Sequence, residues 1–246
     1  NLENFETSEI EDLSEMFMGC THLTSIQIKV INTKNVLTMA DLFNGCTSLE
    51  TMDLSFLDTH NVIDMGNMFN GCSKLTSINI VGLNTSSVEN MTGMFAGCSA
   101  IYTIDLTGMD TKNVIDMSNM FYKCVNLTVL NITGFDTSNV ETMDGMFYNC
   151  TELTLLDLSH FNTENVLTTA QMFYLDDTLF DINMTGWNTE NIDDMRAMFF
   201  NCSNLWSLNL SSFRTDNVEN FDNMFYGLTV PILDLSSFST QNAASM

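Results

Sequence analysis

The seven cysteines are the most chemically reactive side chains of this sequence, and all of them stand at one position of a repeating pattern. Thiolates bind metal ions and form disulfide bonds, so a metal site and a redox pair are the functional alternatives. A straight column of thiols offers poor tetrahedral geometry, and an odd number of them cannot pair completely. We therefore predict reduced cysteines that fill a crowded corner of the fold. The column consists of Cys20, Cys46, Cys72, Cys98, Cys124, Cys150 and Cys202.

Two adjacent acids interrupt this column. Asp176 stands where the neighbouring turns carry cysteine, Asp177 follows it, and Leu175 replaces a glycine just before it. Carboxylate oxygens are the ligands that calcium prefers. Asp176 and Asp177 are therefore weak candidates for calcium binding, and we expect no other cofactor. The remaining acids recur with the repeat, where structural roles explain them, so we do not assign them to a hydrolytic carboxylate pair.

The three histidines offer no catalytic arrangement. His22, His60 and His160 stand at three different positions of the repeat and on distant turns. A nucleophilic triad or a histidine metal site needs its members to converge, which a rigid coil prevents. The sequence also contains no P-loop and no glycine-rich phosphate loop. We therefore predict that the protein is not an enzyme.

A strict internal repeat positions all of these residues. A phenylalanine recurs every 26 residues without a slip. Such self-similarity is typical of a solenoid, in which each turn buries its apolar face only against its neighbours. No linker interrupts the period, so we expect a single domain over residues 1–246, about nine turns long and cut in mid-repeat at both ends. The column contains Phe17, Phe43, Phe69, Phe95, Phe121, Phe147, Phe173, Phe199 and Phe225.

Each turn is predicted to begin with a short β-strand. Leu127, Leu130 and Ile132 point inward, whereas Asn131 points outward, as the alternation of a strand requires. Parallel stacking of these strands predicts a sheet along the whole array. A bend follows, where a recurring threonine is expected to form turn hydrogen bonds. These threonines are Thr33, Thr59, Thr85, Thr111, Thr137, Thr163, Thr189, Thr215 and Thr240.

A short helical segment is predicted after the bend. Val140, Met143, Met146 and Phe147 fall at i, i+3, i+6 and i+7, which is the spacing of one face of a helix. Because the segment is short, a single 3₁₀ turn or a small strand around 140–143 is an alternative. Glycines stand where such a helix would end, namely Gly45, Gly71, Gly97 and Gly227.

Composition narrows the class of partner. The chain has 246 residues, 45% of them hydrophobic, with 7 Lys+Arg against 31 Asp+Glu and a net charge of −24. The hydrophobic content predicts a folded protein. The negative charge argues against nucleic acids and anionic lipids as partners, because both attract cationic surfaces. No run of 18 apolar residues is present, so we expect no direct membrane insertion.

Surface recognition is the remaining class of function. Tyr102, Phe180 and Trp206 share one position near the start of the strand, where other turns mostly carry threonine, and Asp181 adjoins Phe180. Aromatic departures from a polar column fit contact anchors, so these four residues form the candidate ligand-binding site. Half-buried aromatics that shield the edge of the core are the alternative. A second aromatic column is expected to stack between turns, through Tyr122, Tyr148, Tyr174 and Tyr226.

The repeat unit carries the string N-V-x-x-M-x-x-M-F-x-x-C through most turns, in segments such as LNITGFDTSNVETMDGMF (130–147) and MFNGCSKLTSINI (68–80). These segments resemble the 26-residue repeat of bacterial surface proteins, a BspA-like branch of the leucine-rich repeats. The resemblance covers essentially the whole chain. It implies an α/β solenoid, a right-handed leucine-rich-repeat coil with a parallel β-sheet and short helical or 3₁₀ turns. It also implies an extracellular, surface-attached array, and such arrays are often considered adhesion modules.

These features predict a non-enzymatic adhesion module attached to the cell surface or cell wall. Its expected partners are proteins or glycans of a host or of neighbouring cells. The alternative is a structural spacer or a self-assembling surface-layer element, which would associate end to end through its open apolar ends.

Overall fold

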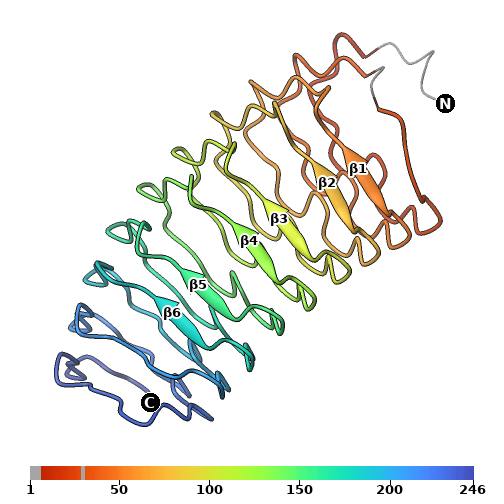
Figure 1. Cartoon of the computed structure of the whole chain (residues 1–246). Coiled ribbons are helices and arrows are strands. Elements are labelled where there is room, and N and C mark those ends of the chain that lie inside the picture. The colour runs from red at the N-terminus through yellow and green to blue at the C-terminus, as the bar shows by residue number, and fades with distance from the viewer. Residues whose placement is uncertain (1–6, 29–30) are drawn as a thin grey trace.

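The computed structural model describes residues 7–28 and 31–246, which form a solenoid of stacked coils (Figure 1). Among these residues, six short strands lie in a row along one side of the array, one in each of six successive coils (Figure 1). The predicted repeat solenoid is therefore confirmed. The strands are β1 (Thr51–Asp53), β2 (Ser77–Asn79), β3 (Thr103–Asp105), β4 (Val129–Asn131), β5 (Leu155–Asp157) and β6 (Asp181–Asn183).

The strands pair in parallel, two at a time. β1 pairs with β2, β3 with β4 and β5 with β6, and each residue lies opposite its equivalent one repeat later, as Leu155 lies opposite Asp181. A cavity of about 420 Å³ lies between β2 and β3. The expectation of one sheet along the whole array was therefore wrong, although the expected strand positions and their parallel direction are confirmed.

The segment predicted to be helical forms no helix in the part of the chain that the structure describes. Its N–H groups alternate between two kinds of partner. Those of Met143, Gly145 and Phe147 donate to carbonyl oxygens of the next coil at 2.9–3.2 Å. Those of Met146 and Tyr148 donate to carbonyl oxygens three residues earlier and close turns within the coil. An α-helix would instead direct every N–H along its own axis. The helical expectation was wrong.

Residues with a positive φ explain why this segment folds as linked turns. Each turn segment has two of them, for example Gly145 with a φ of 58° and Asn149 with a φ of 57°. Glycine and asparagine adopt this left-handed conformation at low cost, and it closes tight turns but ends a helix. Gly71, predicted to end a helix, has a φ of 72° and closes such a turn instead. Leu175 has a φ of 63° at the equivalent position, which strains its backbone.

Parallel bridges join every coil to the next at the start of the turn segments. They run without interruption from Asp12 to Ser245 and include the pair Asp116–Thr142. The alternative of a small strand near residues 140–143 is therefore closer to the structure than the helix. Because this side is bonded at every coil, it fixes the spacing of the coils. The three-residue strands on the other side can then pair at alternate coils without loss of the stack.

The phenylalanine column forms the centre of the core. The rings from Phe17 to Phe225 stack face to face, with neighbouring centroids 5.3–6.1 Å apart and planes within 15° of parallel. The rings from Phe43 to Phe199 are fully buried, and methionines such as Met143 and Met146 are buried beside them. These methionines therefore fill the core.

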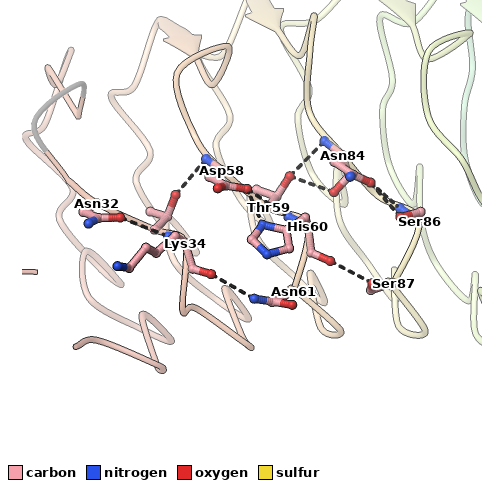
Figure 2. Close-up of polar contacts among 10 residues, drawn as sticks. Asn32, Lys34, Asp58, Thr59, His60, Asn61, Asn84, Ser86 and Ser87 are labelled. Atoms are coloured by element: carbon pink, nitrogen blue, oxygen red, sulfur yellow. Dashed lines mark hydrogen bonds and ion pairs between the residues drawn. The ribbon is translucent and has the colours of Figure 1, made fainter. Parts of the chain in front are cut away.

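The buried threonines join neighbouring coils through one hydroxyl each. The Thr59 hydroxyl accepts a hydrogen bond from the Asn84 N–H at 2.9 Å and donates one to the Asn84 carbonyl at 2.7 Å (Figure 2). Next to this column, the Asn61 side-chain amide donates to the carbonyl of Lys34 in the preceding coil (Figure 2). Since backbone groups inside the coil need partners, these side chains let the bends stack without water.

We expect the substitution Thr163→Val to lower the free energy of unfolding by about 1–3 kcal/mol. Thr163 is buried, and its hydroxyl is bonded to both the N–H and the carbonyl of Asn188, which valine would leave without a partner. Thr163→Ser keeps the hydroxyl and should cost less. Urea denaturation of the two variants measures the difference, and equal losses would contradict this account of the threonine column.

Candidate binding surface

Phe180 and Trp206 form an exposed aromatic pair on the strand side of the solenoid. Phe180 directly precedes β6, and the Trp206 N–H of the next coil donates to the Phe180 carbonyl at 3.0 Å. The two rings stack with centroids 6.4 Å apart and planes inclined by 20°. Trp206 is 67% exposed and Phe180 is 49% exposed. Trp206 therefore covers little of the core, and the pair presents a large apolar surface to solvent.

Leu155 extends this pair by one coil and was missed by sequence reasoning. It is the first residue of β5, it is 66% exposed, and it lies opposite Asp181 in the strand pairing. The Phe180 N–H donates to the carbonyl of Thr154, so backbone bonds connect the three coils. We call Leu155, Phe180 and Trp206 the strand-face patch. A leucine in a polar column was the available signal, because β1, β2 and β3 begin with Thr51, Ser77 and Thr103.

Tyr102 is not part of the strand-face patch. It precedes β3 and lies three repeats before Phe180, and the exposed Val129 lies opposite its chain neighbour Thr103. Thr128 donates to the Tyr102 carbonyl through its N–H and its hydroxyl, both at 3.0 Å. The structure thus stacks Phe180 on Trp206, places Asp181 opposite Leu155, and leaves Tyr102 on a separate strand pair.

Acidic side chains surround the strand-face patch. Asp181 begins β6 and Asp157 ends β5, and both are exposed. Hydrogen bonds from the Ser159 hydroxyl and N–H hold the pKa of Asp157 below its ordinary value, so this carboxylate is charged at neutral pH. Glu152 and Asp177 are exposed just before β5 and β6. The patch is therefore apolar at its centre and anionic at its margin.

The cations of this half of the chain are engaged elsewhere. After residue 120 the sequence contains three, Lys123, Arg196 and Arg214. The Lys123 ammonium lies 4.9 Å from the centre of the Tyr122 ring, and the Arg196 guanidinium is 3.3 Å from the Asp194 carboxylate. Arg214 donates to the carbonyl of Phe213. Among the described residues, no lysine or arginine of this half of the chain thus forms an ion pair with the acids near the patch.

The cysteine column is structural, and all seven thiols are free. Within the column the thiol donates to the carbonyl of a phenylalanine in the preceding coil, as the Cys124 thiol does to Phe95 at 3.1 Å. Burial raises the pKa of the Cys46 thiol to about 11 and those of Cys72 and Cys124 to about 12. Buried, protonated thiols are poor nucleophiles and poor metal ligands. The prediction of free cysteines in a crowded corner is confirmed for six of the seven, whereas Cys20 is exposed.

We expect a thiol reagent at pH 8 to modify one cysteine per native molecule within minutes. Cys20 is the exposed member of the column, whereas the other six are buried. After denaturation all seven should react. Mass spectrometry of the labelled peptides checks the site, and rapid native labelling of Cys98 or Cys124 would contradict the assignment.

Asp176 takes the place of a cysteine inside this column. It is buried, and its carboxylate accepts a hydrogen bond from the Cys150 N–H at 2.6 Å. Burial raises the pKa of Asp176 well above its ordinary value, and the neighbouring charge of Asp177 adds to this effect. Asp177 itself is exposed. Among the described residues, no three or more His, Cys, Asp or Glu side chains form a group that could hold a metal ion. Calcium binding at Asp176 and Asp177 stays a prediction.

We expect Asp176→Asn to raise the free energy of unfolding at pH 8 by about 1–3 kcal/mol, because it removes a charge from an apolar site and keeps an oxygen that can accept from Cys150. The folded-state pKa of Asp176 is raised, so the wild type loses stability as the pH rises from the unfolded pKa through the folded one. The advantage of the variant should therefore shrink at pH 4.

Guanidinium denaturation of both proteins at pH 4 and pH 8 measures this difference. Asp177→Asn is the matched control, because it removes the same charge from an exposed neighbour and should change stability little. A stability difference that does not depend on pH would contradict the raised pKa of the buried Asp176.

The histidines do not converge. His60 is bonded to the exposed Asp58, and His160 is bonded to the carbonyl of Ile132, whereas His22 contacts Thr21. In the part of the chain that the structure covers, no helix is long and apolar enough to cross a membrane.

The second aromatic column stacks as predicted. Neighbouring rings lie 4.5–4.7 Å apart along Tyr122, Tyr148, Tyr174, Phe200 and Tyr226. Because these rings cover one another, their faces are occupied by the chain itself and the column acts mainly as a clamp between coils.

Stacked coils with parallel strands on one side and an apolar column inside define a leucine-rich-repeat solenoid. A sequence model of the family described as "Mycoplasma protein of unknown function, DUF285" matches residues 1–104, 93–204 and 154–246, so the chain belongs to this family. The resemblance to a bacterial repeat family of this kind is confirmed by this match. No curated protein sequence is significantly similar to the chain.

The solved structure of a bacterial repeat protein supports the fold. A leucine-rich repeat protein from Eubacterium ventriosum is 17% identical, and the match covers 84% of this chain and 50% of that one with a TM-score of 0.54. A leucine-rich repeat protein from Bacteroides ovatus is also 17% identical, with coverage of 87% and 70% and a TM-score of 0.34. The present chain thus spans half the length of the Eubacterium protein, and the likeness concerns the fold alone.

Proposed function

We propose that this chain is a non-enzymatic adhesion module that is displayed outside a bacterial cell and binds a protein of a host or of a neighbouring cell through the strand-face patch. Residues 1–246 work in this proposal as one solenoid. The observation that carries it is the exposed stack of Phe180 and Trp206, which lies on backbone that hydrogen bonds hold in place.

A binding role agrees with the chemistry of the patch. Protein-binding hot spots are enriched in tryptophan and other large side chains that are ordered before the partner arrives, which limits the entropy lost on binding. Phe180 and Trp206 order each other by stacking, and Leu155 enlarges the apolar area. A protein partner fits this apolar surface better than a glycan, which would need a more polar set of hydrogen-bonding groups.

The extracellular location in this proposal follows from the repeat family and from charge. A net charge of −24 repels polyanions such as nucleic acids and suits a soluble surface array. A passive spacer or a self-assembling layer is the competing proposal. It requires no particular side chain at Trp206, so substitution of this residue separates the two.

We expect Trp206→Ser and Phe180→Ser each to weaken binding to the captured protein by about thirtyfold or more, which corresponds to loss of a hot spot. Purified chain is first tested by surface plasmon resonance against a panel of extracellular-matrix proteins and mucins. Because both side chains are largely exposed, the free energy of unfolding should change by less than about 1 kcal/mol.

Leu167→Ser is the matched control for Leu155→Ser. Leu167 is an exposed leucine too, but it lies in the turn segment of its coil, away from the strands. Binding should fall with Leu155→Ser and persist with Leu167→Ser. Saturable binding that tolerates all substitutions in the patch would contradict the proposed site, and a panel without any hit would favour the spacer.

A further inference from the structure

We infer that the strand-face patch receives an arginine side chain of the partner protein, with the guanidinium over the Trp206 indole and against the carboxylate of Asp181. This inference rests on the proposed function and names the chemistry that the site selects. Its support is an exposed indole stacked on Phe180, next to a coil whose exposed acids, Asp181 among them, form no ion pair with a lysine or arginine of the described chain.

The first step is the availability of the indole. Trp206 stacks on Phe180 through one face of its ring and is 67% exposed, so much of the indole is open to a partner. The other tryptophan, Trp187, offers no such surface, because it is buried and its indole N–H donates to the Leu158 carbonyl at 3.0 Å. Tryptophan is the aromatic side chain that attracts cations most strongly.

The second step is the uncompensated charge. Asp181 adjoins Phe180 in sequence, and Asp157, Asp177 and Glu152 lie in the same two coils, all of them exposed. Lys123, Arg196 and Arg214 are held on Tyr122, Asp194 and Phe213, respectively. Like charges gathered without counter-ions raise the local negative potential, and a cationic partner relieves it.

The third step distinguishes arginine from lysine. A guanidinium is planar and weakly hydrated, so it can lie on an indole face and donate in parallel to a carboxylate at the same time. A lysine ammonium is a compact, strongly hydrated charge that gains less from an aromatic face. The leucine of the patch then offers apolar contact to the residue beside the arginine, so the recognised segment combines arginine with an aliphatic or aromatic neighbour.

Synthetic peptides test this inference without knowledge of the natural partner. The probe is a fluorescently labelled ten-residue peptide in which one arginine is flanked by leucines and the remaining residues are uncharged. Two matched peptides replace the arginine with citrulline, which is neutral and nearly isosteric, or with lysine. Fluorescence anisotropy should give an affinity about threefold to thirtyfold higher for arginine than for citrulline, the range of one cation–π contact, with lysine between them.

Variants of the protein locate the contact. Trp206→Leu keeps an apolar side chain but should remove the preference for arginine over citrulline, and Asp181→Asn should reduce it at least threefold. Asp193→Asn removes the same charge from an exposed position in the turn segment and should leave the preference unchanged. Equal binding of the arginine and citrulline peptides, or an equal effect of Asp181→Asn and Asp193→Asn, would overturn the inference.

The outcome is separable from that of the proposed function. Suppose that a matrix protein binds through Trp206, but that neither Asp181→Asn nor blocking of the matrix protein's arginines with a dicarbonyl reagent weakens this binding. The adhesion site would then stand, and the arginine contact would be refuted. Loss of binding in both treatments supports the contact.

Discussion

The hydrogen bonds between turn segments are the interaction on which the rest of this structure depends. Every second N–H of the segment donates to the next coil, and the N–H groups between them close turns within their own coil, as Gly145 and Met146 do. This alternation leaves no backbone group free to continue a helix. It also fixes the coil length, because one inserted residue would exchange the two sets of N–H groups. The unbroken phenylalanine period in the sequence follows from this constraint.

Identical coils bring identical side chains into contact, and this selects residue types that tolerate their own copies. Phenylalanine rings stack, threonine hydroxyls both donate and accept, and cysteine thiols donate to a carbonyl of the preceding coil. Charged residues do not tolerate such a column. On the strand side the Asn79 amide donates to the Asp53 carboxylate, so that aspartate and asparagine alternate. Asp176 is an exception to this rule, because it places a carboxyl group within the column of buried thiols.

The sequence contained enough to predict the solenoid, the inward residues and the roles of the Phe, Cys, Thr and Tyr columns, because periodicity reports directly which side chains meet. The helix predicted over residues 140–147 does not form, because the helical spacing of apolar residues coincides with the spacing of successive tight turns. The signal for turns was present in Gly145 and Asn149, which tolerate a positive φ. No sequence pattern indicates that the strands pair two at a time instead of forming one sheet. Leu155 was not predicted as a site residue, because it is aliphatic and the predicted contact anchors are aromatic.

The strand-face patch is informative because the fold does not require it. The equivalents of Trp206 in the first three coils are Thr24, Glu50 and Thr76, and those of Leu155 include Thr51, Ser77 and Thr103. Those coils stack with the same phenylalanine column and the same bridges, so polar residues satisfy every internal demand at these positions. Exposed apolar surface costs free energy in water and contributes nothing to the coil beneath it. The coils of a repeat protein can be compared with one another at equivalent positions. Here the apolar residues of the strand-face patch are not needed for stacking, which favours a role in binding a partner.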